Sequence, residues 1–501
     1  MNLHTPETPA PLTSAPDQLR TFPEPPWLPG GATPDQLLEW ELHAAREDGR
    51  DPAAIDAIEQ EAASLSGGDL LPLYRKVIDL PVDPSFAYDE PYELEAIRAL
   101  RPNAGQRRHD VPTDDAFLYE RLYGAWLGRC VSCTLGGPGE SFRPVTRERQ
   151  KQFLQAISTD EWPIRDYLPL HSPSELTFRG IKTDATRGNV RYAPQDDDLA
   201  HTVVCQLALR SLDNPREFET QDIARCWYQY LAYRLTEGGC AMMAFRNLTL
   251  RYPMRRLGRC PRGTDPIDWH WGATHSNPFR ENIDASLRAD QYGYAAPGDC
   301  ELAADLAWRD GRASNVKNGL YCSMFYAAMI AAAFVKDDPE AIIEAGLAEI
   351  PSTCRLYEAA HKTIEISKKH MHDDADTLHD AIYTAFGDCD KSIINNMALV
   401  VSALLVGGHD FEKVVTYAVM GGWDCDCTGA SAGSIAGTML GASRLPEKWI
   451  GPLNDTMQGG AVGYDPIPIS QCARHSVAIA QRVLGSERVN KAQRSAESVE
   501  I

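Results

Sequence analysis

Three consecutive aspartates, Asp196 to Asp198, follow Gln195 and stand directly before a helix-like run that opens at Leu199. Carboxylate and amide oxygens are hard ligands that suit Mg²⁺, Mn²⁺ or Ca²⁺. Acidic side chains also stabilise the start of a helix, because its free N–H groups and dipole favour negative charge. A cap needs one or two aspartates, however, and three adjacent carboxylates repel one another. We therefore expect Asp196, Asp197 and Asp198 to bind a metal ion, with simple capping as the alternative.

A second acidic cluster follows Gly-Gly-Trp and reads Asp424-Cys-Asp426-Cys. Alternation places Asp424 and Asp426 on one side of an extended turn, from which both carboxylates could face one ion. Glycine then recurs every four residues, at positions 429, 433, 437 and 441. Glycine costs about 1 kcal/mol relative to alanine in a helix, so this repetition indicates close approach of another backbone or a ligand. Tight helix packing alone would explain the glycines but not the carboxylates in front of them.

The second cluster also fits, letter by letter, the D-x-D-x-T motif of haloacid dehalogenase phosphatases. In those enzymes the first aspartate is a phosphoryl nucleophile at the end of an apolar strand near the N-terminus of a domain. Here the motif comes after 423 residues and precedes a glycine-rich helix. The context therefore favours a metal site over a phosphatase nucleophile.

Composition excludes several classes of function for these 501 residues. The formal net charge of -21, with no basic patch, argues against a nucleic-acid partner. The N-terminal residues lack the basic and apolar regions of a signal peptide. The longest apolar run, from Leu320 to Val335, is shorter than the roughly 20 residues of a membrane span, so we expect a buried core helix and no membrane partner.

The 13 cysteines are scattered along the chain and odd in number. This pattern is typical of reduced thiols in a cytoplasmic protein rather than of a disulfide framework. Cys130 and Cys133 form a close pair, but a structural zinc site would need a second such pair or histidines at ligand spacing.

The periodicity of apolar residues predicts an all-α protein with one large helical domain. Apolar side chains recur at three- and four-residue spacing, while sustained strand-like alternation is absent. The Pro- and Gly-rich stretches 160–195 and 251–300 are expected to be long irregular connections. The predicted organisation is a disordered Pro-rich tail at 1–34, a helical extension at 35–111, a catalytic domain at 112–484 and a C-terminal tail at 485–501.

Together with a third segment, the two acidic clusters resemble the ADP-ribosylglycohydrolase family, which includes the dinitrogenase-reductase-activating glycohydrolase and the J1 crystallins. The third segment, from Gly124 to Glu140, is similar without gaps to the family's opening pattern GAxxGxxxGDxLGxPxE. The aspartate triplet stands where the family has T-D-D-T, and Asp-Cys-Asp-Cys stands where it has D-x-D-T. The resemblance covers roughly residues 117 to 484 and implies an all-α fold with two metal ions, Mg²⁺ or Mn²⁺, at the base of a cleft.

The resemblance also implies roles for individual residues. Glu140, Asp197 and Asp424 would be catalytic, with Glu140 moving protons beside the scissile bond. Gly136, Gly137 and Asn315 would contact the substrate. The metal ligands would be Asp196, Asp197, Asp198, Asp424, Asp426 and Cys427.

Several positions depart from the family pattern. Gln195, Asp198 and Cys427 each replace a threonine, and Ser132-Cys133 replaces Gly-Asp. Asn315 stands where many relatives carry histidine. The function expected is metal-dependent hydrolysis of an ADP-ribosyl or related ribosyl bond in a small molecule or a modified protein. The alternatives are a nucleoside or small-riboside hydrolase and a catalytically silent member that only binds metal or nucleotide.

Overall fold

The computed structural model describes residues 33–103, 105–141, 145–170, 183–232, 239–252, 267–387 and 392–497, with the side chains of the last range described to 485. Within these ranges the chain forms helices and one two-stranded antiparallel sheet, which confirms the predicted all-α class. It divides into two compact units, residues 1–86 and 87–501. The segment 87–111, predicted as part of the extension, belongs to the larger unit.

The smaller unit contains α2 (Pro34–Glu47), α3 (Pro52–Ala62), η3 (Gly67–Leu70) and α4 (Leu71–Ile78). Thr33 and Gln36 form a capping box at the start of α2, and Asp51 caps α3, each followed by a proline in the first turn. Leucine and isoleucine side chains from these helices, with Tyr74 and Val77 of α4, form a core of their own. This part of the predicted helical extension is therefore helical, and most of the predicted tail lies outside the described residues.

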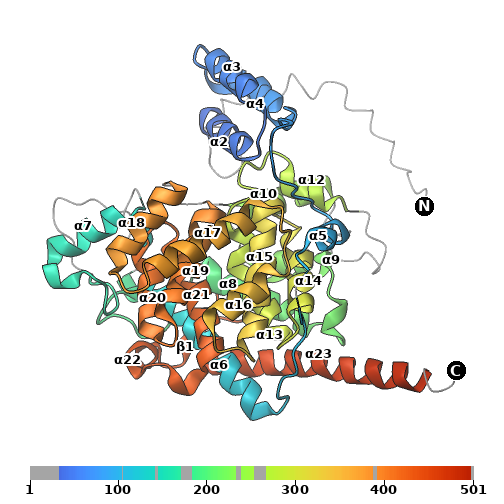
Figure 1. The fold of residues 1–501 in the computed structure, drawn as a ribbon, viewed down its shortest axis with the longest axis vertical. Helices are drawn as coiled ribbons and strands as arrows, with labels where there is room; N and C mark the ends of the chain where they lie inside the picture. The colour runs from blue at the N-terminus through green and yellow to red at the C-terminus, as the bar shows by residue number, and fades with distance from the viewer. Residues whose placement is uncertain are drawn as a thin grey trace, which may run out of the picture. The chain divides into compact units, whose positions relative to one another are not determined.

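The larger unit opens with α5 (Leu94–Leu100) and α6 (Asp115–Gly136) and continues through the elements shown in Figure 1. These are η4 (Gly139–Ser141), α7 (Arg147–Ile157), η5 (Thr159–Glu161), η6 (Thr183–Ala185), α8 (Asp197–Arg210), η7 (Pro215–Glu217), α9 (Thr220–Tyr230), α10 (Cys240–Arg251), α12 (Trp269–Thr274), η9 (Ile283–Arg288), α13 (Asp290–Ala295), α14 (Cys300–Gly311), α15 (Lys317–Ala333), α16 (Pro339–Leu347), α17 (Arg355–Lys369), α18 (Ala375–Phe386), α19 (Ile393–Gly407), α20 (Phe411–Met420), α21 (Cys425–Leu440), η10 (Ala442–Arg444), α22 (Glu447–Ile450), η11 (Gly451–Leu453), β1 (Thr456–Met457), β2 (Ile467–Pro468) and α23 (Ile469–Glu497).

Two sequence expectations about connections and ends need correction. The stretch 267–300, expected to be irregular, contains α12, η9 and α13, whose short lengths give too little periodicity to detect. The final helix α23 continues to Glu497, into the segment predicted as a C-terminal tail.

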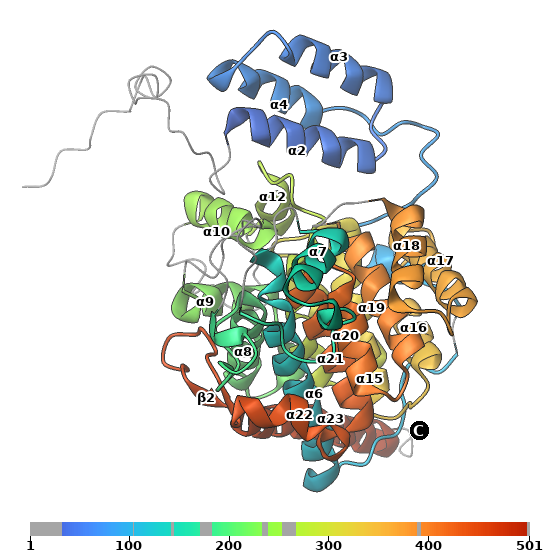
Figure 2. The same cartoon turned by 90° about the vertical axis from the view of Figure 1, so that its left-hand side faces the viewer.

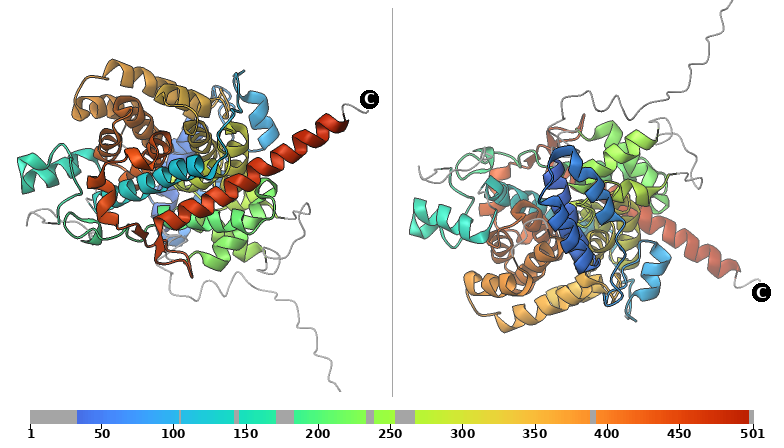
Figure 3. Two further views of the ribbon diagram at one scale, coloured as in Figure 1. Left: turned by 90° about the horizontal axis from the view of Figure 1, so that it is seen from below. Right: turned by 90° about the horizontal axis from the view of Figure 1, so that it is seen from above.

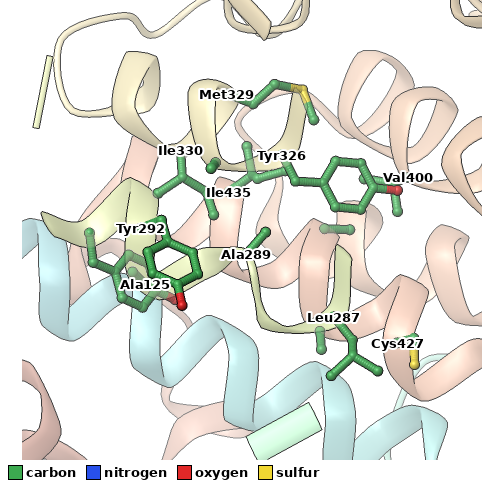
Figure 4. Packing of buried hydrophobic residues seen from close by; sticks show 14 of the residues in the cluster. Ala125, Leu287, Ala289, Tyr292, Tyr326, Met329, Ile330, Val400, Cys427 and Ile435 are labelled. Atoms are coloured by element: carbon green, nitrogen blue, oxygen red, sulfur yellow. The ribbon is translucent and has the colours of Figure 1, made fainter. Parts of the chain in front are cut away.

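The apolar run near residue 320 forms α15, whose residues are buried from Asn318 to Ala333. It contacts α13, α14, α16, η9 and α21, and therefore lies at the centre of the core. Figure 4 shows side chains from several of these helices packed together, including Tyr292, Tyr326 and Ile435. In the described part of the chain, no helix combines the length and the apolar character needed to cross a membrane.

The helices α6 and α21 pack antiparallel at backbone contact (Figure 2). A Cβ atom added at Gly128 would lie 2.0 Å from the carbonyl oxygen of Gly433, and one at Gly437 would lie 2.1 Å from that of Gly124. Any side chain at these positions would force the helices apart. The glycines repeated every four residues in α21 therefore allow the close backbone approach that was predicted.

The long helix α23 lies across α6 and also contacts α8 (Figure 3). The indole Nε1 of Trp126 on α6 donates a hydrogen bond to Ser476 Oγ on α23, at 3.0 Å. Gln206 on α8 donates to the same hydroxyl oxygen at 2.9 Å. This buried contact fixes α6 and α8 relative to each other, and with them the elements that carry the site.

Replacing Gly128 by alanine should lower the free energy of unfolding by about 3 kcal/mol, the upper part of the range for overpacking, because the added methyl group meets backbone. Gly485 is the matched control, since it is exposed on α23 with nothing within 4 Å of an added Cβ. Gly485→Ala should leave stability unchanged or raise it by up to about 1 kcal/mol. Urea unfolding followed by tryptophan fluorescence measures both, and equal midpoints for the two variants would contradict the packing account.

Candidate metal centre

The first acidic cluster lies at the start of α8, as predicted. Asp196 is the N-cap residue, and its side chain accepts a hydrogen bond from the backbone N–H of Asp198 at 3.1 Å. Asp196 and Asp198 are buried, whereas Asp197 is half-buried. The approach to the helix is held by the residue that follows β1, because the Gln195 N–H donates to the side-chain oxygen of Gln458 at 3.2 Å. Asp196 therefore acts as the cap, and capping does not account for Asp197 and Asp198.

The second cluster has a different conformation from the predicted extended turn. Asp424 is the N-cap of α21, and Asp426 already lies in the first turn of that helix. The sharp entry uses positive φ at Gly422 (74°) and at Trp423 (54°). The buried Trp423 ring stacks on Tyr383 with centroids 4.2 Å apart, which holds this unusual backbone in place. Alternation predicted the wrong local geometry because the helix starts earlier than the glycine pattern indicates.

The fold brings the two clusters together. Oxygens of Glu140, Asp424 and Asp426 all lie within 4.8 Å of one another. A second group with the same spacing contains Asp198, Asp426 and the sulfur of Cys427. Because Asp426 belongs to both groups, they form one continuous set of donors.

A third group of this kind joins Cys133 to Asp196 and Asp198. Asp197 belongs to none of the three groups formed by the described residues, although its charge helps to raise the pKa of the Cys427 thiol. The carboxylate and thiol donors fit divalent cations by their chemistry.

Glu140 reaches this site because the end of α6 packs on the start of α21. A Cβ atom at Gly136 would lie 2.3 Å from the Cys425 carbonyl oxygen and 2.5 Å from the Asp426 nitrogen. Gly137 follows as the C-cap of α6, its N–H bonded to the Cys133 carbonyl at 2.9 Å. Both glycines were predicted to contact substrate; the structure shows that Gly136 packs against the backbone of α21.

Asn315, also predicted to contact substrate, is fully buried between protein groups. Its amide nitrogen donates to the Asn282 carbonyl at 2.8 Å, and its amide oxygen accepts from the Cys240 thiol and the Ser314 hydroxyl. These hydrogen bonds connect Asn315 to neighbouring loops and helices rather than to the acidic residues.

Arg129 is the residue that the sequence analysis missed. Its fully buried guanidinium forms ion pairs with Asp198 Oδ1 at 3.1 Å and Asp290 Oδ2 at 3.0 Å. It also donates to the backbone carbonyls of Asp198 and Leu287. One signal was available, since Arg129 is the only charged residue between Arg121 and Glu140 in an otherwise apolar and small-residue helix.

Burial and these contacts shift the pKa values of the acidic groups in the site. Burial raises the pKa of Asp198 to about 8, although Arg129 opposes the shift and Asp196 adds to it. Burial also raises the pKa of the Asp290 carboxyl and, together with the nearby aspartates, that of the Cys427 thiol. The Cys427 thiol donates a hydrogen bond to Asp198 Oδ2 at 3.0 Å. Both carboxylate oxygens of Asp198 are therefore held by protein groups: Oδ1 by the Arg129 guanidinium and Oδ2 by the Cys427 thiol.

Replacing Arg129 by methionine should cost about 3–5 kcal/mol of unfolding free energy, because it leaves two buried carboxyl groups without their counter-ion. The exposed Arg474 on α23 is the control, for which Arg474→Met should cost about 1 kcal/mol or less. Adding Asp198→Asn and Asp290→Asn to Arg129→Met should recover part of the loss in urea unfolding. If the triple variant is less stable than Arg129→Met alone, the counter-ion explanation is wrong.

Comparison with known proteins identifies the family. The model of the family described as ADP-ribosylglycohydrolase matches residues 114–488. No protein with a curated description matches the sequence. A solved structure named "ADP-ribosylglycohydrolase-related protein complex" is similar at 15% identity, covering 74% of this chain and 99% of that chain with a TM-score of 0.44. The family match covers all three sequence motifs and most of the larger unit, so the chain belongs to the ADP-ribosylglycohydrolase family.

Proposed function

We propose that this protein hydrolyses the glycosidic bond between a ribose and its leaving group in an ADP-ribosyl or related ribosyl compound, with divalent cations held by the acidic residues of α8 and α21. The observation that carries the proposal is the convergence of Glu140, Asp424 and Asp426, which come from two of the family's motifs. Mg²⁺ or Mn²⁺ fits these three oxygen donors. When bound, such ions supply Lewis-acid polarisation of the ribose hydroxyls.

Glu140 is the residue best placed to move a proton. It lies on the three-residue 3-10 helix η4 and is half-buried, whereas Asp424 and Asp426 are buried at the start of α21. A carboxylate at the border between the buried acids and solvent can accept a proton from an attacking water and return it to the leaving group. Asp424 and Asp426, behind it, would hold the divalent cations that keep the ribose in place.

The helix starts make this arrangement rigid. Two hydrogen bonds hold the backbone of Asp424. Its N–H donates to the side-chain oxygen of Asn396 at 3.2 Å, and its carbonyl accepts from the Thr428 hydroxyl at 2.9 Å. A site held by helix termini needs little rearrangement to bind a cation or a transition state. Asp197, half-buried at the first position of α8, completes the proposed catalytic set with Glu140 and Asp424.

The proposal is tested by release assays with Mg²⁺ or Mn²⁺ on ADP-ribosyl-arginine, ADP-ribosyl-serine, O-acetyl-ADP-ribose and simple nucleosides. We expect turnover of at least one ribosyl substrate, and the set distinguishes modified proteins from small ribosides. Absence of release from every substrate at saturating metal, by a folded protein that binds Mn²⁺, would indicate a silent family member instead.

Glu140→Gln should lower kcat on the substrate identified by about 10²- to 10⁴-fold, the usual contribution of a general acid or base. Asp424→Asn should instead raise the Mn²⁺ concentration needed for half-maximal activity, because it removes one charged donor. The control is Glu95→Gln, whose side chain is 81% exposed on α5 and which should change neither quantity. Retention of full activity by Glu140→Gln would remove this residue from the mechanism.

A further inference from the structure

Cys427 places a sulfur atom among the acidic side chains. Its Sγ lies 3.0 Å from Asp198 Oδ2 and belongs to the group formed with Asp198 and Asp426. The residue is in the first turn of α21, 9% exposed, and lies at the edge of the packed apolar cluster in Figure 4. The sulfur is thus fixed by a helix and directed toward two carboxylates.

The two groups that share Asp426 differ in chemistry. Glu140, Asp424 and Asp426 offer only oxygen, which suits Mg²⁺ or Mn²⁺, whereas Asp198, Asp426 and Cys427 offer two oxygens and one sulfur. Thiolate ligands favour more thiophilic metals such as Zn²⁺. We propose that the centre is mixed, with a thiophilic divalent cation of the Zn²⁺ or Co²⁺ class at Asp198, Asp426 and Cys427 beside an oxygen-bound cation. This inference rests on the proposed metal-dependent function.

The surrounding contacts leave the sulfur as the natural donor at this position. The hydroxyl of the neighbouring Thr428 donates to the Asp424 carbonyl inside the helix, so it does not replace Cys427 as an oxygen ligand. Arg129 holds Asp198 through Oδ1, which directs Oδ2 toward the Cys427 sulfur. When a cation binds, the sulfur releases its proton to solvent and the metal–sulfur bond replaces the hydrogen bond to Asp198.

The direct test is Co²⁺ binding to the full-length protein, followed by absorption. Coordination by Cys427 should produce a thiolate-to-cobalt charge-transfer band in the near ultraviolet, and Zn²⁺ should displace it. Cys427→Ser and Cys427→Thr should abolish the band and weaken Zn²⁺ binding by more than the roughly 10- to 100-fold that follows loss of an outer-shell contact. Mn²⁺ affinity should change far less than Zn²⁺ affinity in the same variants.

Two neighbouring cysteines provide matched controls. Cys425 belongs to none of the donor groups found among the described residues, and its sulfur lies 2.8 Å from an added Cβ at Gly139, so Cys425→Ser should keep the band. Cys133 shares a group with Asp196 and Asp198, and Cys133→Ser should also keep it. Loss of the band in Cys133→Ser but not in Cys427→Ser would place the cation elsewhere and overturn the inference.

X-ray absorption of the unmodified protein loaded with Zn²⁺ gives a readout that needs no variant. One sulfur in the coordination shell is expected, and a shell of oxygen and nitrogen alone would overturn the inference. In that case Mn²⁺ binding and ribosyl release would still support the proposed function. If no divalent cation binds at all, the inference and the metal-dependent function both fail.

Discussion

The site depends on backbone contact between α6 and α21. Glycines at Gly124, Gly128, Gly433 and Gly437 allow the two helices to pack without intervening side chains. The same antiparallel contact continues to Gly136, which meets the first turn of α21 at the second acidic cluster. Because Glu140 follows only four residues later, the packing of this helix pair determines where the proposed catalytic carboxylate lies. Glycine costs conformational entropy in a helix, but only glycine allows the backbones of α6 and α21 to approach this closely.

Electrostatics imposes the second constraint. Buried carboxyl groups from α8 and α21 lie close together, and like charges in a low-dielectric interior repel strongly. Arg129, on α6, offsets part of this charge by pairing with Asp198 and Asp290. The helix α6, which packs on α21 through its glycines, therefore also supplies the buried Arg129 guanidinium. Divalent ions would complete the neutralisation, and this is why the donor groups make physical sense as a metal centre rather than as caps alone.

The sequence predicted the features that are local or repeated. Helical periodicity gave the all-α class, the glycine spacing gave the close helix approach, and the three motifs gave the family. It missed what depends on tertiary contact. The turn at Trp423 is held by stacking on Tyr383, and the pairing of Arg129 with Asp198 joins residues from different helices. The hydrogen bonds of the buried Asn315 to Asn282, Cys240 and Ser314 were also not predicted.

We propose that residues of α8 and α21, with Glu140, form a single metal centre. Crystals of the protein soaked in millimolar Mn²⁺ and measured for anomalous scattering test it most directly. We expect an anomalous peak within coordination distance of Asp426, since this residue is common to two donor groups. A well-ordered site with no anomalous peak between Asp198, Asp424 and Asp426 would contradict it.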